Sequence, residues 1–406
     1  MLPLLLAFFY QVSKVNASRG IGSSVVNQTD YTQPDWLNWT IKEDVNLDLK
    51  VNMKDVAALV STFNSQPGKP SWVPNYDVYN DSRINMRDIA TVISKFGWVG
   101  STPSPTTLIV SSTTSLYETG VEDQMKTAFQ AQFPWITINF LSQGTGIALQ
   151  TAMRGDADMV MVHSPSQELP FMTGGYGVNR KVFASNFFII VGPQNDPANV
   201  TGMSPLDAMK QIKTLGEQGK AIWVSRGDGS GTNTKEKSLW AAAGINWTQI
   251  RTETSWYKET GQGMTPTLLV ANELGGYTLS DTASYLTNTN AGNIQMKIVV
   301  QAQKDLLNVY SVIADNPLNA NLTQTNFVAE MLFVNWLITP DGQNLLANYG
   351  TATFGAPLFT PFVPLLSTGS NATLLSWIQN YAYFNGTECP TSYRYDSSIL
   401  YDYPWD

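Results

Sequence analysis

Short apolar runs followed by turns rich in Ser, Thr and Gly recur three times along the chain. The three segments span residues 107–129, 136–153 and 221–244. Their apolar runs are Thr107–Val110, Ile136–Phe140 and Ala221–Val224, and a helical pattern of polar and apolar positions follows each turn, from Tyr117 to Phe129 in the first segment. Each pattern predicts a buried strand that leads through a turn into the start of a helix, which is typical of α/β proteins.

These three turns predict a site for a small anion. The first N–H groups of a helix have no partner within it and lie at its positive dipole end, and Arg226 stands six residues before Thr232. Turns at the carboxyl ends of neighbouring strands can meet in one crevice. The alternative is that the turns only cap their helices. A nucleotide site is not favoured, because no GxxxxGK[ST] pattern occurs and the stretch 143–146 lacks the third glycine of a dinucleotide fingerprint.

A twelve-residue pattern is duplicated near the N-terminus, where 44–55 recurs 33 residues later as 77–88. A helical apolar pattern follows each copy, with Val56, Leu59, Val60 and Phe63 after the first and Ile89, Val92, Ile93 and Phe96 after the second. Oxygen-bearing residues at alternate positions meet calcium's need for six to eight hard ligands. The duplication therefore predicts two calcium loops, each followed by a helix.

The two loops offer different ligands. In the first, the ligands are Asp44, Asn46, Asp48, Lys50 through its carbonyl, Asn52 and Asp55. In the second, they are Asp77, Asp81, Arg83 through its carbonyl, Asn85 and Asp88, with the poorer ligand Tyr79 at position three. Neither loop has the usual glycine at position six, where Leu49 and Ser82 stand. We expect the second loop to bind calcium more weakly than the first. The alternative is a helix pair in which the Asp residues act only as caps.

The duplication resembles a type I dockerin module over about residues 41–97. The resemblance implies calcium as cofactor and a protein partner, either a cohesin-like domain or another envelope protein. Residues 98–106, WVGSTPSPT, then form a linker into the main body.

From Thr107 to about Val363 the chain resembles the substrate-binding component of tungstate ABC importers. The matching stretches begin with STTSLYETG at Ser112 and QGTGIALQTAMRGDADMVMVHS at Gln143. They continue with GYGVNRKVFASNFFIIVGP, SRGDGSGTNTKE, WYKETGQGMTPTLLVANELGGYTLSD, LLNVYSVIADNP and NWLITPDGQ. Related phosphate-binding proteins share the RxDGSGT turn, so a phosphate-type oxyanion binder is an alternative. The sequence departs from the tungstate group at Asn233, where His is common, and at Val309, where Pro is usual.

This resemblance implies an anion site and roles for its residues. The implied donors are Thr113, Thr114, Ser115, Gly144, Thr145, Arg226, Ser230, Gly231 and Thr232. Tungstate and molybdate are fully ionised dianions at neutral pH, so a cage made only of donors suits either ion. We expect Asp228 to turn away from the ligand onto Arg226 or a helix start, because a carboxylate facing the ligand would instead suit hydrogen phosphate. We expect Arg180 to be an exposed arginine rather than a second cation of the site.

The predicted organisation is a two-lobed α/β fold of the type II periplasmic-binding-protein class, preceded by a small all-α, EF-hand-like domain. The predicted parts are a signal-like segment and extension (1–40), the dockerin-like pair (41–97), the linker (98–106), the oxyanion-binding body (107–365) and an aromatic tail (366–406). Lobe 1 would comprise about 107–190 and 308–365, and lobe 2 about 191–307. The hinge would cross near Val191–Pro193 and Leu306–Asn308.

Composition and sequons bear on location and partners. The net charge is −8 and no run of Lys and Arg occurs, so nucleic acid is not an expected partner. The sequons are at Asn16, Asn27, Asn38, Asn80, Asn199, Asn246, Asn321, Asn371 and Asn385. They predict export and glycosylation, and the apolar run Leu2–Tyr10 resembles a signal segment. We expect a secreted or cell-surface protein that delivers a small oxyanion to an ABC permease in the membrane.

Other residues with chemical potential carry less weight. The single histidine, His163, follows an apolar run and is expected to be a packed or hydrogen-bonded residue rather than a catalytic base. Without a nucleophile and base pair, an exported enzyme is not favoured. The lone Cys389 excludes an internal disulfide. We expect the tryptophans at 223, 240, 247, 256 and 336 in cores or interfaces. The remaining alternative is a cell-surface assembly or scaffolding protein that reuses the binding fold.

Overall fold

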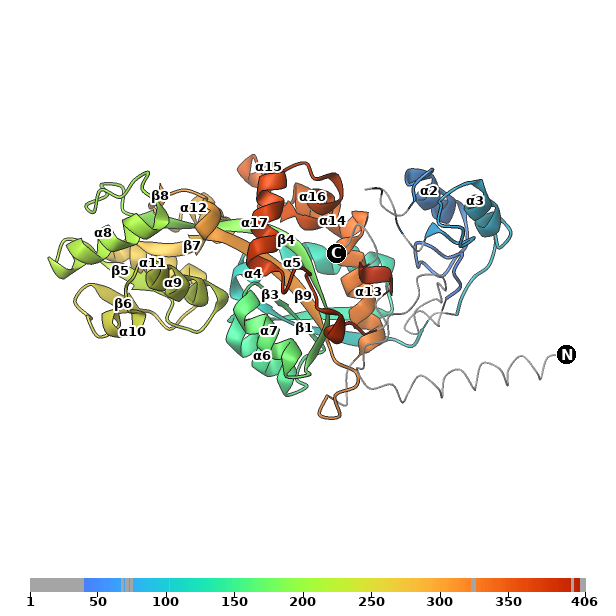
Figure 1. Ribbon diagram of the computed structural model, residues 1–406, viewed down its shortest axis with the longest axis horizontal. Coiled ribbons are helices and arrows are strands. Elements are labelled where there is room, and N and C mark those ends of the chain that lie inside the picture. Colours follow the sequence, from blue (N-terminus) through green and yellow to red (C-terminus); the bar gives the residue numbers. More distant parts are fainter. Residues whose placement is uncertain are drawn as a thin grey trace.

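The computed structural model describes residues 40–66, 69, 73, 76–101, 103–322, 326–395 and 398–401. The predicted signal-like segment lies outside these residues, as do the sequons at Asn16, Asn27 and Asn38. Figure 1 shows three parts along the longest axis: a helix pair at one end, a lobe built on β1, β3 and β9, and a second lobe around β5 and β7. Among the described residues, no helix is both long enough and apolar enough to cross a membrane.

Lobe 1 is built on a mixed sheet. Its strands, in spatial order, are β10 (Thr360–Pro361), β4 (Gly177–Gly192), β9 (Leu307–Asp315), β3 (Met159–Val162), β1 (Thr106–Thr113) and β2 (Ile136–Gln143). β1 is parallel to β2 and β3, whereas β9 is antiparallel to both β3 and β4. The parallel pairing places the carboxyl ends of β1 and β2 side by side, where Thr113 is paired with Gln143. Two of the three predicted turns therefore begin at the same edge of this sheet.

Helices cover lobe 1. They are α4 (Thr114–Glu118), α5 (Val121–Gln132), α6 (Thr145–Met153), α7 (Pro165–Thr173), α13 (Phe327–Ile338), α14 (Pro340–Asn348), α15 (Thr351–Phe354), α16 (Phe362–Thr368), α17 (Ala372–Ala382) and α18 (Ser398–Tyr401), with the 3-10 turn η4 (Thr391–Tyr393). The helix predicted from Tyr117 to Phe129 is two helices. The chain breaks between α4 and α5 at Gly120, whose φ of 77° lies in the left-handed region that glycine adopts without strain.

One strand links the two lobes. Up to Phe187, β4 pairs with β9 of lobe 1, and from Phe188 onward it pairs with β7 (Thr278–Asp281) and β8 (Lys297–Val300) of lobe 2. The chain returns to lobe 1 through η3 (Lys304–Leu306) and β9. This change of partner lies three residues before the lobe boundary expected between residues 190 and 191.

Lobe 2 holds a compact aromatic core. Its other elements are α8 (Pro205–Glu217), β5 (Trp223–Ser225), α9 (Gly231–Ala242), α10 (Trp247–Ile250), β6 (Tyr257–Glu259), α11 (Met264–Leu274) and α12 (Thr282–Asn290). Trp223, Trp240 and Trp256 are buried in this core as predicted, and Trp336 is buried in that of lobe 1. The Glu236 carboxylate accepts hydrogen bonds from Trp223, Trp240, Tyr257 and Ser225. These bonds fix β5 against α9 and so determine where the turn between them lies.

The N-terminal helix pair consists of α2 (Met53–Ser61) and α3 (Met86–Ile93). Asn52 and Asn85 cap these helices in the same way, each within a capping box that is completed by an aspartate three residues later. Within the predicted apolar pattern, Val56, Leu59, Ile89 and Val92 form the core of the pair. The remaining four positions, Val60, Phe63, Ile93 and Phe96, are exposed.

The described part of the C-terminal tail is a strap packed on β4. Asn179 exchanges two hydrogen bonds with the backbone of Tyr395, and Lys181 donates to the carbonyl of Leu400 at 2.7 Å. The expectation that Arg180 is exposed is wrong: this side chain is buried and pairs with Glu168 at 2.8 Å. The C-terminal tail helps to bury Arg180, which also donates to the Glu388 carbonyl. Tyr403 and Trp405 lie outside the described residues.

The buried pair of Lys181 and Glu388 joins the strap to lobe 1, so we expect it to contribute to the free energy of unfolding. Glu388→Gln removes the negative charge of this buried pair while keeping the shape of the side chain, so we expect the free energy of unfolding to fall by about 3 kcal/mol. Glu217→Gln, which removes an exposed partner of Lys213, is the matched control and should cost less than about 1 kcal/mol. Denaturant unfolding of the three proteins measures both values, and equal losses would contradict a structural role for the strap.

Candidate functional site

The candidate site lies between the lobes, where the three predicted turns meet. Lobe 1 contributes the end of β1 and the start of α6, and lobe 2 contributes the turn between β5 and α9. A Cβ atom placed on Gly144 would lie 3.5 Å from Ser230 Cβ and 3.7 Å from Asp228 Oδ2. A Cβ atom on Gly146 would lie 3.3 Å from the carbonyl oxygen of Gly229. Turns more than 80 residues apart in the chain are thus in contact.

Arg226 is the cation of this site. Its side chain is 2% exposed, and Nη2 donates to Thr114 Oγ1 across the lobe boundary at 2.8 Å. Nη1 lies 3.5 Å from Thr232 Oγ1 at the start of α9. The guanidinium therefore links a lobe 1 turn to its own helix start. A buried arginine needs an opposite charge or an anionic ligand, because burial removes its hydration.

Asp228 supplies that opposite charge. Its Oδ2 accepts from Arg226 Nη2 at 2.6 Å and from Nε at 3.1 Å, while Oδ1 accepts from the Ser230 N–H at 3.1 Å. This is the expected orientation, in which the carboxylate holds the donors in place. Both oxygens accept protein hydrogens, so Asp228 neutralises Arg226 and holds the Ser230 N–H in place.

Several predicted donors converge on this pair. Thr113 Oγ1 lies 3.3 Å from Ser115 Oγ, and the Ser230 side chain caps α9 by accepting from the Asn233 N–H. Gly231 and Thr232 are the first residues of that helix, so their N–H groups have no partner within it. Thr145 stands apart: its hydroxyl is buried and makes no hydrogen bond. A buried hydroxyl without a partner is costly, so this atom points to a ligand that would satisfy it.

His163 lies against the same cluster. Nδ1 is 2.8 Å from Asn308 Oδ1, which assigns the ring proton to Nδ1, and Nε2 is 3.5 Å from Ser115 Oγ. The ring stacks on Tyr310 with centroids 5.2 Å apart. Burial lowers its pKa to about 4, so the imidazole is neutral. A Cβ on Gly231 would come within 2.7 Å of Nε2, which explains the glycine at the start of α9. The expected packed and hydrogen-bonded role is confirmed.

The structure also brings in residues that the sequence did not single out. Glu118 accepts from the N–H and hydroxyl of Thr265, and Gln167 donates to Thr234 at 2.7 Å, so both pairs join the lobes. Burial raises the pKa of Glu118. Asp281 is buried at the start of α12, and burial raises its pKa as well. No local signal marks these residues, because their partners are distant in the chain.

The two calcium loops have the same backbone arrangement. In the first, Asp44 accepts from the N–H groups of Asp48 and Leu49, and in the second Asp77 accepts from those of Asp81 and Ser82. Among the described residues, the side chains of Asp77, Asp81 and Asp88 bring their carboxylate oxygens within 4.8 Å of one another. The close carboxylates favour calcium binding by the second loop, whereas the types of ligand residue favour the first loop. The higher calcium affinity of the first loop therefore stays a prediction.

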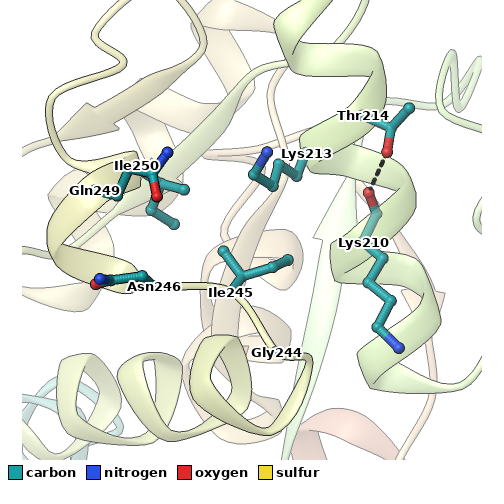
Figure 2. Close-up of a pocket in the computed structure, with 8 residues that line it drawn as sticks. All are labelled: Lys210, Lys213, Thr214, Gly244, Ile245, Asn246, Gln249 and Ile250. Carbon is teal, nitrogen blue, oxygen red and sulfur yellow. Dashed lines mark hydrogen bonds between the residues drawn. The ribbon is translucent and has the colours of Figure 1, made fainter.

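A hollow on the outer surface of lobe 2 is a separate feature. Figure 2 shows the Lys213 side chain extending from α8 towards Ile245, with Lys210 and Thr214 on the same helix. Both lysines are already paired, Lys210 with Asp207 and Lys213 with Glu217. The hollow therefore lacks the buried, aimed donors of the interlobe site. Asn246 and the five other described sequon asparagines, at 80, 199, 321, 371 and 385, are exposed.

Comparisons with known proteins agree with this geometry. The PBP superfamily domain matches residues 100–341, and the dockerin type I domain matches residues 42–97. The tungstate-binding protein TupA of Peptoclostridium acidaminophilum is 36% identical over 266 residues, which cover 65% of this chain and 89% of that protein. The likenesses support the resemblance to both families that the sequence motifs indicated.

Two solved structures are similar to the body of the chain. The tungstate-binding protein TupA from Desulfovibrio alaskensis G20 is 36% identical, with a TM-score of 0.52, and covers 63% of this chain and 98% of its own. The tungstate ABC transporter structure from Geobacter sulfurreducens is 34% identical, with a TM-score of 0.52, over 60% of this chain and 98% of its own. They confirm the α/β fold predicted for the body.

The buried environment of His163 predicts an unusual titration. Since burial lowers its pKa from 6.5 to about 4, the folded protein binds this proton less readily than the unfolded chain does. The histidine therefore contributes stability that is present above pH 6.5 and is lost as the pH falls towards 4. Because the chain has one histidine, nuclear magnetic resonance of its ring nitrogens reports this site alone. A folded-state midpoint near 6.5 would contradict the buried, neutral assignment.

Proposed function

The chain belongs to the PBP superfamily, and we propose that it is an exported solute-binding protein that captures tungstate or molybdate for an ABC importer. Two of the similar proteins described above are tungstate-binding proteins, and a third is a tungstate ABC transporter structure. The observation that carries the proposal is the meeting of three donor turns around a buried arginine and an unpartnered Thr145 hydroxyl.

The charge arrangement favours a dianion with no proton to donate. The guanidinium of Arg226 and the N–H groups at the start of α9 are donors, and hydroxyl groups can rotate to donate. Hydrogen phosphate would need an acceptor for its own proton, whereas Asp228 is oriented onto Arg226 and the Ser230 N–H. Tungstate and molybdate carry no such proton at neutral pH. Their similar charge and shape leave both as ligands of the proposed site.

The two lobes provide the proposed capture step. Donors come from both sides of the boundary, so a ligand that contacts both sides stabilises the closed arrangement more than an open one. Closure would use β4 and the crossing at Leu306–Leu307 as the hinge. The bonds from Glu118 to Thr265 and from Gln167 to Thr234 would form on closing. A closed, loaded protein is then the form that a membrane permease would recognise.

The helix pair would act as a calcium-dependent docking module. Its exposed apolar positions are repeated, with Met53, Val60 and Phe63 on the first helix side matching Met86, Ile93 and Phe96 on the second. An exposed apolar surface of this kind marks a protein contact. The matched dockerin type I domain supports a cohesin-like domain as the partner. Such a contact would hold the transport receptor at the cell surface.

Thr145→Val gives a sharp test of the anion site. Valine has the shape of threonine without its hydroxyl, and this hydroxyl has no partner in the protein, so the variant should fold with unchanged or slightly higher thermal stability. Its affinity for tungstate and molybdate should fall about 10- to 100-fold, the value of a hydrogen bond to a charged group. Calorimetric titration measures the affinity.

Arg226→Ala and an exposed control complete that experiment. We expect Arg226→Ala to lose more than about 100-fold in affinity, because a buried charge contact is lost. Arg154→Ala removes an exposed arginine and should bind like the parent protein. Sulfate and phosphate titrations run alongside. Unchanged tungstate and molybdate binding in both site variants would contradict the proposed site, and phosphate binding tighter than either would favour the phosphate alternative.

The docking proposal predicts calcium-dependent binding of a purified cohesin domain. Since the two helix faces are related by the repeat, either could hold the partner, so the variant Val60→Asp with Ile93→Asp changes both. We expect at least a 10-fold loss of affinity, because a charge enters an apolar contact. Ile147→Asp, at an exposed isoleucine of α6, is the matched control. Binding that survives both calcium chelation and the double substitution, measured by surface plasmon resonance, would refute this route.

A further inference from the structure

The duplicated loops differ in chemical character at positions four and six. Positions four and six are Leu47 and Leu49 in the first loop, and Asn80 and Ser82 in the second. All four residues have left-handed backbone, with φ of 60°, 64°, 66° and 61° in that order. Asparagine tolerates this conformation, whereas for leucine it is disfavoured. Two leucines in a loop with this strained backbone indicate a compensating contact.

That contact is the core of lobe 1. Leu47 and Leu49 are 7% and 5% exposed, and they belong to the same buried cluster as Phe133 and Trp135 of the body rather than to the core of the helix pair. Gln132, at the end of α5, donates to the carbonyl of Asn46 at 2.8 Å. In the second loop, the matched Asn80 and Ser82 are exposed.

The ligand residues of the first loop hold these leucines in position. Asp44 Oδ2 accepts from the Leu49 N–H at 2.9 Å, and Oδ1 accepts from the Asp48 N–H at 3.0 Å. Asp55 accepts from the N–H groups of Asn46 and Asn52, at the two ends of the loop. These carboxylate and amide oxygens are ligands of the type that calcium prefers. The residues that would hold the ion therefore also shape the segment that packs on lobe 1.

We propose that the first loop is an internal interface, in which calcium binding fastens the helix pair to lobe 1, and that the second loop has no such role. This inference rests on the proposed calcium function of the module. Leu47 and Leu49 are covered by α5 and its neighbours, so the exposed faces of α2 and α3 remain free to bind an external partner. The module is then a rigid extension of lobe 1 when calcium is bound, and the receptor's orientation on its partner depends on the ion.

Hydrogen exchange of the full chain tests the interface directly. With calcium, exchange in residues 121–133 and 46–51 should slow by about tenfold or more relative to the protein with chelator. Asp55→Asn should abolish this effect, whereas Asp88→Asn, the matched change in the second loop, should keep it. Leu47→Asn with Leu49→Ser, which copies the second loop, should keep calcium binding and lose the protection of 121–133.

Calcium calorimetry on the same proteins separates the possible failures. Loss of one site in Asp55→Asn, with protection of 121–133 unchanged, would overturn the interface and leave the docking function standing. No calcium binding by the parent protein would overturn both. Protection lost equally in Asp55→Asn and Asp88→Asn would also overturn the inference, because it would assign the effect to the module as a whole.

Discussion

The buried charge of Arg226 is the constraint on which the site depends. A guanidinium that is 2% exposed must be neutralised, and Asp228, two residues further on, does this with both oxygens engaged. Glu236 fixes the turn that carries the pair, because its carboxylate accepts hydrogen bonds from side chains of β5, α9 and β6. The result is a neutral ion pair surrounded by N–H and hydroxyl donors. Such a place can attract an anion without the protein as a whole being basic, because aimed donors act at short range and the net charge of −8 is screened.

The same constraint explains the two-lobed architecture around the site. The candidate donors come from both lobes: β1 and α6 belong to lobe 1, and Arg226 and α9 belong to lobe 2. A single long strand, β4, changes partners at Phe187 and Phe188 and so connects the lobes without a separate linker. Lobe 1 is stiffened on its far side by the C-terminal strap, where Glu388 meets Arg180 and Lys181 of the same strand. Rigid lobes on a short hinge suit the proposed closure on one small ion.

The N-terminal duplication shows how one backbone can serve two purposes. Both loops place an aspartate over the following N–H groups, and both helices start from an Asn cap within a capping box. The side chains at positions four and six decide whether the loop meets an apolar core or water. The left-handed region is unfavourable for leucine, and burial of the apolar side chain offsets this cost. The pair is therefore symmetric in its backbone and asymmetric in its surroundings.

Local features of this protein were determined by the sequence itself. The strand, turn and helix order of the three donor segments, the repeated loops, the packed His163 and the orientation of Asp228 follow from residue type and spacing over short stretches of chain. Tertiary structure alone decided what lies far apart in sequence. It buried Arg180 under the tail, joined Glu118 to Thr265 across the lobes and placed Leu47 and Leu49 in the core of the body. It also left the Thr145 hydroxyl without a partner. The physical reason is that burial and pairing depend on which distant segments pack over a residue. The pattern of residues around that position in the sequence does not specify those segments.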